Sequence, residues 1–144
     1  MAFDGPGPFD GDPAFILQAE LEEAPEDAEA IIEDALATAL EQSYIDVDDG
    51  VWAWVAAELI ATNIGRPGPD SMPPAFQRVK VSDVSDLASL AVEALAAVAD
   101  VDRSELAQLW AEGYDDPLST RLVDLTQRLV GETARGRSGP PDTR

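Results

Sequence analysis

The sequence predicts an all-α fold, a single-domain irregular helical bundle of five to seven helices. In each convincing periodic segment, apolar residues recur at spacings of three and four, which is the period of an amphipathic helix. No segment shows the strict apolar–polar alternation of a half-buried strand. Aspartate–proline and glycine–proline steps stand at the ends of these segments, as they do where helices start and stop. The length of 144 residues fits one domain.

We expect three parts along the chain. Residues 1–12 form a Gly/Pro-rich N-terminal arm, residues 12–131 form the all-α domain, and residues 132–144 form a disordered tail that is almost free of apolar residues. Within the arm, glycines and prolines surround Phe9. Because glycine lets the backbone pass close to another surface, we expect the arm to fold back and Phe9 to anchor it in the bundle.

Two helices are expected before residue 44. Asp12 and Pro13 make a favoured pair of N-cap and first helical residue, so the first helix begins there. Its apolar stripe consists of Ala14, Leu17, Leu21 and Ala24. Pro25 begins the second helix, and the acids in its first turn suit the helix dipole. The second stripe consists of Ala28, Ile32, Ala35, Leu36, Ala39 and Leu40.

The stretch "DVDDGVWAWVAAELI" predicts the third helix, which Gly65 ends just before Pro67. This helix is apolar on nearly every side, so we expect it to be the central and most buried one. The acids ahead of it do not form a calcium loop of the EF-hand type, because no register places the acids, the glycine and a final glutamate correctly. We interpret Asp48 as the N-cap, with Asp49 well placed for the helix dipole.

Three further helices are expected after residue 80, and the segment "AFQRVKV" before them forms either one helical turn or a short extended piece. A helix that starts between residues 82 and 85 buries Leu87, Leu90, Ala91, Ala94, Leu95 and Val98. Asp102 caps a short helix that buries Leu106, Leu109 and Trp110. Asp116 and Pro117 begin the last helix, with the stripe Leu118, Leu122, Leu125 and Leu129.

The composition excludes several kinds of chemistry. The chain contains neither cysteine nor histidine, which rules out disulfides, thiolate metal sites and catalytic triads built on histidine. We therefore expect no cofactor and no structural zinc. The longest apolar stretch, residues 51–64, is too short to span a bilayer, and no basic segment leads into an apolar run at the start. The sequence thus predicts a soluble cytoplasmic protein.

The net charge of −20 is unevenly placed along the chain. Residues 1–65 carry a charge of −16 with no lysine or arginine, whereas residues 66–144 carry −4. Such a chain repels nucleic acid and anionic membranes, so any charged partner is expected to be a basic protein. Two other interpretations stay open, namely that the charge serves solubility alone or that it suits a salt-rich cytoplasm.

Three side chains of the third helix stand out. Glu58 has apolar neighbours, and a buried carboxylate must be paired, hydrogen-bonded or protonated. Its possible partners are a backbone N–H of the N-terminal loop or one of Arg66, Arg78, Arg103, Arg121 and Arg128. Trp52 and Trp54 lie two residues apart and cannot share a face, so if one is in the core, the other is available to a partner.

These observations leave three hypotheses for function. The first is a non-catalytic interaction or regulatory module that binds a basic protein partner. The second is a carboxylate-based binder of a divalent cation such as Mg²⁺, Mn²⁺ or Ca²⁺, or a hydrolase, whose metal ligands would be Asp48, Asp49 and Glu58, with Asp12 beside them. The third is an acidic, salt-adapted protein with no special site. The side chains singled out for binding are Phe9, Asp12, Asp48, Asp49, Glu58, Trp52 and Trp54.

Four motifs in order, "GPGPFDGDPA", "DDGVWAWVAAELIA", "GRPGPD" and "SELAQLWAEG", resemble a small bacterial family catalogued as domain of unknown function 4259. The resemblance covers about residues 5–130 and implies the order of elements, but the family carries no assigned activity. The opening motif departs from the family pattern, because Phe3 and Asp4 replace its tryptophan and Gly11 replaces its asparagine. The matching residues are Gly5, Gly7, Phe9, Asp12, Asp49, Gly50, Glu58, Leu106, Leu109 and Trp110.

Overall fold

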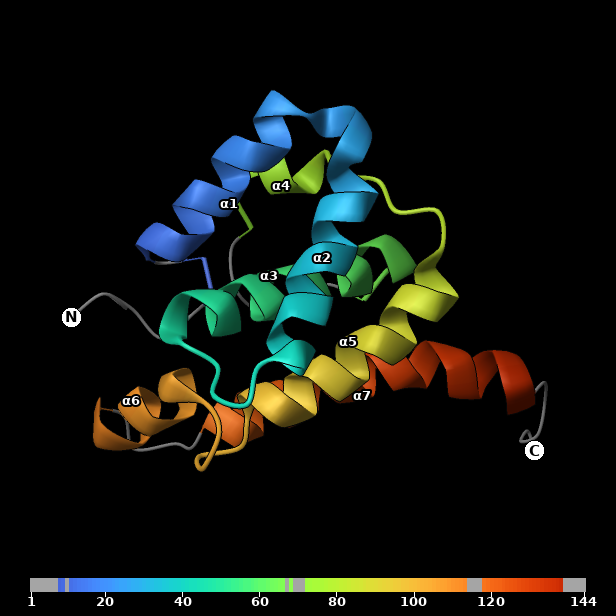
Figure 1. Cartoon of the computed structure of the whole chain (residues 1–144). Helices are drawn as coiled ribbons and strands as arrows, with labels where there is room; N and C mark the ends of the chain where they lie inside the picture. The colour runs from blue at the N-terminus through green and yellow to red at the C-terminus, as the bar shows by residue number, and fades with distance from the viewer. Residues whose placement is uncertain (1–7, 10, 67, 69–71, 114–117, 139–144) are drawn as a thin grey trace.

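The computed structural model describes residues 8–9, 11–66, 68, 72–113 and 118–138, and this part of the chain is an all-α bundle without strands (Figure 1). The predicted fold class is therefore confirmed, with seven α-helices in the described residues. A single 3₁₀ turn, Pro25–Asp27, joins the first two of them. The helices are α1 (Asp12–Glu23), α2 (Ala28–Glu41), α3 (Val47–Ile64), α4 (Pro74–Gln77), α5 (Val84–Val98), α6 (Glu105–Gly113) and α7 (Leu118–Ser138).

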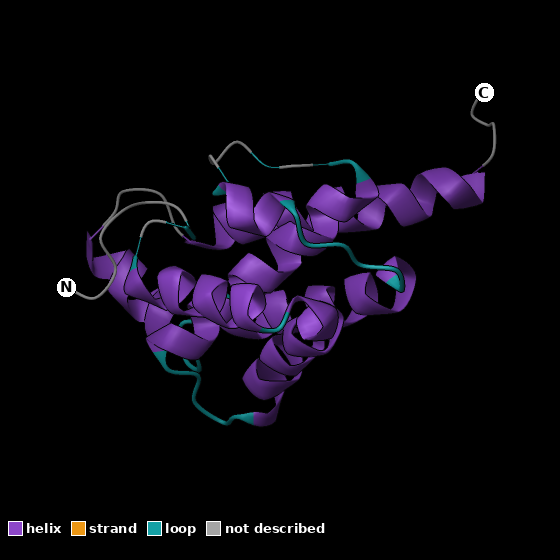
Figure 2. Cartoon of the chain, turned by 90° about the horizontal axis from the view of Figure 1, so that it is seen from above, coloured by secondary structure: helices purple, strands orange, loops and turns teal. Residues whose placement is uncertain are grey.

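Helix α3 lies at the centre of the bundle and contacts each of the other six α-helices (Figure 1). Seen from above, the described chain consists of helices joined by loops (Figure 2). Every residue from 50 to 61 is buried except Trp52, which is half-buried. A helix that is apolar all round has no face to offer water, so it can be stable only when other helices enclose it. The prediction that this helix is the most buried one is confirmed. Helices α1 and α4 pack on one side of it, and α6 and α7 pack on the other.

The start of α3 differs from the prediction. Asp46, not Asp48, is the N-cap, and its side chain accepts a hydrogen bond from the backbone N–H of Asp49 at 3.0 Å. The reason is tertiary: Ile45 pairs with residues 103–105 in an isolated parallel bridge, which keeps the chain extended until Asp46. Asp48 therefore lies inside the first turn, where its carboxylate is not needed for capping.

Two other predicted caps also shift. The N-cap of α1 is Gly11, and Asp12 is the first helical residue, with no side-chain capping bond. At the start of α6 the cap is Ser104 rather than Asp102, since the Ser104 hydroxyl accepts from the N–H of Ala107 at 3.2 Å. In each case a neighbouring serine or glycine is the N-cap instead. The local sequence alone does not show which of the neighbouring candidates caps the helix.

Helix α7 continues to Ser138, beyond residue 131 where we expected the tail to begin. A single glycine inside a helix costs about 1 kcal/mol relative to alanine and does not force a stop. The last six residues of the expected tail lie outside the described chain, as do Asp116 and Pro117. Of the segment left open as one turn or an extended piece, residues 75–77 belong to the single helical turn α4 and residues 79–81 are not helical. No described helix has both the length and the apolar character needed to cross a bilayer.

Gly65 ends α3 as predicted, with φ of 98° in the left-handed region. A Cβ at this position would meet nothing within 4 Å, so a substitution there changes backbone strain alone. We expect Gly65→Ala to lower the free energy of unfolding by about 1 kcal/mol, measured by urea denaturation. Gly65→Asn should lower it less, because asparagine tolerates this conformation better. Equal losses for the two variants would contradict this explanation.

Candidate functional site

The starts of α3 and α6 are joined side by side through residue 45. The N–H of Ile45 donates to the carbonyl of Arg103 at 2.7 Å, and its own carbonyl accepts from the N–H of Glu105 at 2.8 Å. The side chain of Glu105 then accepts from the N–H of Val47 at 3.0 Å. The carboxylate of Glu105 is therefore next to the acidic run that opens α3.

Helix α1 brings a further acid to the same place. The indole N–H of Trp52 donates to the carbonyl of Pro13 at 2.8 Å, which fixes the start of α1 against α3. Asp48 lies four residues before Trp52 and so on the same face of α3. Asp12, next to Pro13, consequently comes close to Asp48. We call the set Asp12, Asp46, Asp48, Asp49 and Glu105 the acidic end; it lies on the left in Figure 1, where three helices begin.

The clustering of these acids changes the pKa of Asp48. Partial burial raises the pKa of its carboxyl group, and repulsion from Asp46, Asp49, Glu105 and Asp12 raises this pKa further. Folding therefore makes the ionised carboxylate less favourable than it is in the unfolded chain. The dipoles of the three helices, each with its positive end here, offset part of that repulsion.

Exposed apolar side chains flank the acidic end. Tyr44 is 47% exposed, and its hydroxyl donates to Gln108 at 2.7 Å. Gln108 in turn donates to the carbonyl of Val101, which is also exposed, so both side chains are held at the same corner. On the α1 side, Phe15 is 69% exposed and Ile16 lies beside it. The surface thus combines a dense negative charge with apolar side chains that are open to solvent.

Glu58 does not belong to the acidic end. It lies ten residues beyond Asp48 on the same helix, which corresponds to about 15 Å. It is buried, and Arg128 holds it with two parallel bonds, Nη1 to Oε1 at 3.0 Å and Nη2 to Oε2 at 2.9 Å. Of the partners considered from the sequence, Arg128 is thus the one that binds Glu58, and the expected convergence of Glu58 with Asp48 is wrong.

Arg128 is held by more than Glu58. It also donates to the carbonyl of Arg66 at 3.2 Å and to Asp124 at 3.2 Å. Burial acts to lower the pKa of Arg128, but hydrogen bonds and charge from Glu58 and Asp124 raise it overall. A Cβ at position 68 would lie 2.8 Å from one guanidinium nitrogen, so Gly68 leaves the room that Arg128 occupies. This pair is a structural connection between α3, α7 and the segment after α3.

The aromatic residues singled out from the sequence mainly serve packing. Phe9 packs against Phe76 of α4, with ring centroids 5.4 Å apart, as expected of an anchor for the arm. Trp54 is buried edge-on to Trp110. Trp52 is half-buried and its indole N–H is bonded to α1, so neither tryptophan is an exposed anchor for a partner.

The exposed apolar residues and Glu105 were not predicted from the sequence. Phe15 and Ile16 could have been found, because they fall off the buried stripe of the first helix. Glu105 could not, since no local signal tells that its helix starts beside residue 47.

The described residues contain no group of three or more carboxylates that could hold a metal ion. The reason is visible in the acidic end. Asp46 accepts from a backbone N–H, Asp49 accepts from the side chain of Gln42 at 2.6 Å, and Glu105 accepts from another backbone N–H. A cation site requires several oxygens that converge on one point. The oxygens named here each accept from a different donor and do not converge.

Comparison with known proteins adds a family but no activity. The family model described as "Domain of unknown function (DUF4259)" matches residues 4–119. No curated protein and no solved structure matches the chain. The function must therefore be inferred from the geometry of the described residues.

Replacing Glu58 by glutamine should lower the free energy of unfolding by about 3 kcal/mol, because it removes the buried counter-charge of Arg128 and leaves only the exposed carboxylate of Asp124. Asp124→Asn is the matched control, since it removes the exposed carboxylate from the same arginine and should cost less than about 1 kcal/mol. Urea denaturation measures both. Similar small losses for the two variants would show that the buried pair is not what holds α7 to α3.

Asp46→Ala and Asp48→Asn should act in opposite directions. Loss of the Asp46 cap should cost about 1 kcal/mol. Asp48→Asn should stabilise the fold at neutral pH and low salt, because it removes a carboxylate whose pKa is raised in the folded state. That gain should shrink at about pH 3, where wild-type Asp48 is protonated in the folded and unfolded states alike. Thermal melts at both pH values test this, and a destabilised Asp48→Asn variant at neutral pH would contradict it.

Proposed function

We propose that this chain, which belongs to the DUF4259 family, is a non-catalytic interaction module whose acidic end binds a basic protein. The observation that carries the proposal is the environment of Asp48, where carboxylates from the starts of α1, α3 and α6 repel one another. A cationic partner would reduce this repulsion. The free energy by which the repulsion destabilises the free protein would then contribute to the free energy of binding. Sites of this kind are commonly less than optimal for stability because they serve function.

Arg103, the arginine nearest to Glu105 in sequence, does not neutralise the acidic end. Arg103 lies two residues before Glu105, but it donates to the carbonyls of Leu40 and Gln42 at 2.7 and 3.0 Å. Its guanidinium is therefore engaged at the C-terminal end of α2, where a cation also suits the helix dipole. Within the acidic end, Asp12, Asp46 and Asp48 are exposed to solvent.

The apolar side chains beside the acidic end supply the second element that an interface needs. Complementary charge mainly speeds association and selects the partner, whereas buried aromatic anchors supply most of the affinity. Tyr44 and Phe15 are the exposed aromatic residues next to the acids. The partner that fits is therefore a protein whose surface combines lysine or arginine with apolar depressions for these two rings.

The test uses immobilised protein to capture binders from an extract of the source organism, at low salt and in about 1 M KCl, where the Debye length falls to about 3 Å. We expect a basic protein that is retained at low salt and released at high salt. Its kinetics should then be measured with purified components. Failure to retain any basic protein at low salt would overturn the proposal.

Paired variants locate the interface. Asp12→Asn with Asp48→Asn should slow association, and Phe15→Ala with Tyr44→Ala should speed dissociation about tenfold or more, as loss of anchors does. The matched controls are Asp86→Asn with Glu93→Gln on α5 and Val123→Ala on α7, which change equally exposed residues elsewhere. Equal effects of the test and control variants would mean that overall charge and not the acidic end drives binding.

A further inference from the structure

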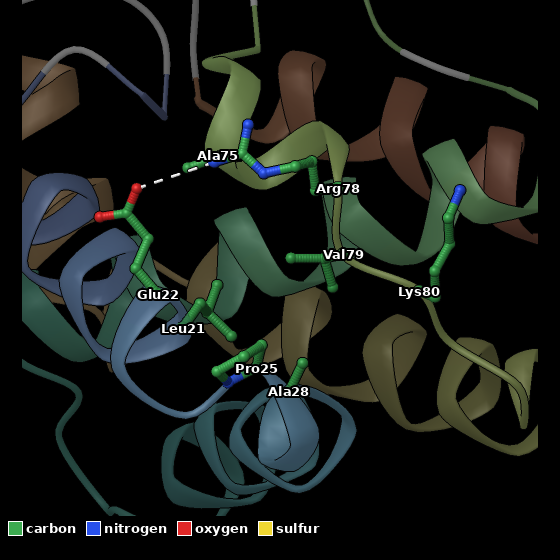
Figure 3. A pocket seen from close by; sticks show the side chains of 8 residues that line it. All are labelled: Leu21, Glu22, Pro25, Ala28, Ala75, Arg78, Val79 and Lys80. Carbon is green, nitrogen blue, oxygen red and sulfur yellow. Dashed lines mark ion pairs between the residues drawn. The ribbon is translucent and has the colours of Figure 1, made fainter.

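A groove opens between the C-terminal half of α1, the start of α2 and the segment that follows α4 (Figure 3). Its volume of about 430 Å³ lies within the range of small-molecule sites, roughly 300–1,000 Å³. Leu21, Ala28 and Val79 contribute apolar surface between the two walls. Glu22 and Arg78 face one another across it, and Lys80 lies further along the same segment as Arg78.

The charge of this groove is opposite to that of the rest of the molecule. In a chain of net charge −20, two cations line it, and Lys80 is the single lysine of the sequence. Lys80 makes no ion pair with any described residue. Arg78 reaches Glu22 at 4.0 Å, but the arginine side chain is 70% exposed, and such a contact contributes little. The charge of Glu22 therefore offsets one of the two positive charges that line the groove. One positive charge then remains to attract a ligand.

The wall that carries the two cations is held in place from both sides. Asn63 of α3 donates to the carbonyl of Val79 at 3.2 Å and accepts from the N–H of Val81 at 2.9 Å. Glu29 of α2 accepts from the N–H and hydroxyl of Ser82 at 3.0 and 2.9 Å, and from the N–H of Asp83 at 3.2 Å. A segment fixed in this way forms its side of the groove before any ligand arrives, which lowers the entropic cost of binding.

We propose that this groove binds a small organic monoanion with an apolar body, of the class of medium-chain carboxylates. The carboxylate pairs with Lys80, which Glu22 does not offset, and the hydrocarbon lies along Leu21, Ala28 and Val79. A single negative charge matches the net charge of the groove, whereas the carboxylate of Glu22 disfavours a doubly charged phosphate. The site is separate from the acidic end and does not depend on the proposed function.

The test is an NMR titration of the full chain with octanoate, with acetate and 1-octanol as the charge-only and chain-only comparisons. We expect octanoate to shift the backbone signals of residues 21–28 and 78–82 in a saturable way. Acetate and 1-octanol should bind much more weakly, because each lacks one of the two contacts. Saturable shifts elsewhere, no binding of octanoate, or equal binding of 1-octanol would each overturn the proposal.

Charge variants make the test sharper. Lys80→Gln should weaken octanoate binding about fivefold, the size of one solvent-exposed ion pair, while Lys80→Arg should retain it. Glu22→Gln should strengthen binding, because it removes the competing carboxylate. Glu23→Gln is the matched control, since this exposed neighbour makes the same change of net charge but does not line the groove. Equal gains for the two glutamates would overturn the proposal.

Discussion

The burial of α3 on all sides is the constraint on which the rest of the structure depends. A helix without a polar face forces six others to surround it, and the carboxylates at its start and within it then lie in two kinds of place. One is its N-terminus, where Asp46, Asp48 and Asp49 emerge to solvent. The other is its interior, where the carboxylate of Glu58 must find a cation or remain neutral. The carboxylates at the start of α3 thus form the acidic end, and the buried carboxylate of Glu58 forms an ion pair with Arg128.

The bundle places two different surfaces at the two ends of α1. Its start contributes Asp12 to the acidic end, and its C-terminal half lines the groove together with Arg78 and Lys80. Both surfaces are built on segments tied down by side-chain hydrogen bonds, through Trp52 and Glu105 at one end and through Asn63 and Glu29 at the other. The molecule therefore carries two chemically different surfaces on one rigid framework, and a change at one need not disturb the other.

The periodic signals of the sequence were sufficient for the fold class, because the stripes of α1, α2, α5 and α7 and the stop at Gly65 depend on local chemistry. The N-caps were not, since the choice of Asp46 over Asp48 depends on how Ile45 pairs with residues almost sixty positions away. Glu58 could be recognised as a residue in need of a partner, but five arginines qualified equally. The acidic end could be foreseen in part, through Asp12, Asp48 and Asp49. Glu105 and the groove arise from tertiary packing, which no local pattern records.

The pairing of Glu58 with Arg128 also has a consequence for the order of events during protein synthesis. The two residues are separated by 70 positions, and the first 65 residues contain no lysine or arginine. When α3 has just been made, its central carboxylate therefore finds no lysine or arginine among residues 1–65 to neutralise it. Helices α1 to α3 have little reason to close around that charge before the ribosome has delivered α7. Commitment to the native core is thus postponed until α7 has been made, well after α3.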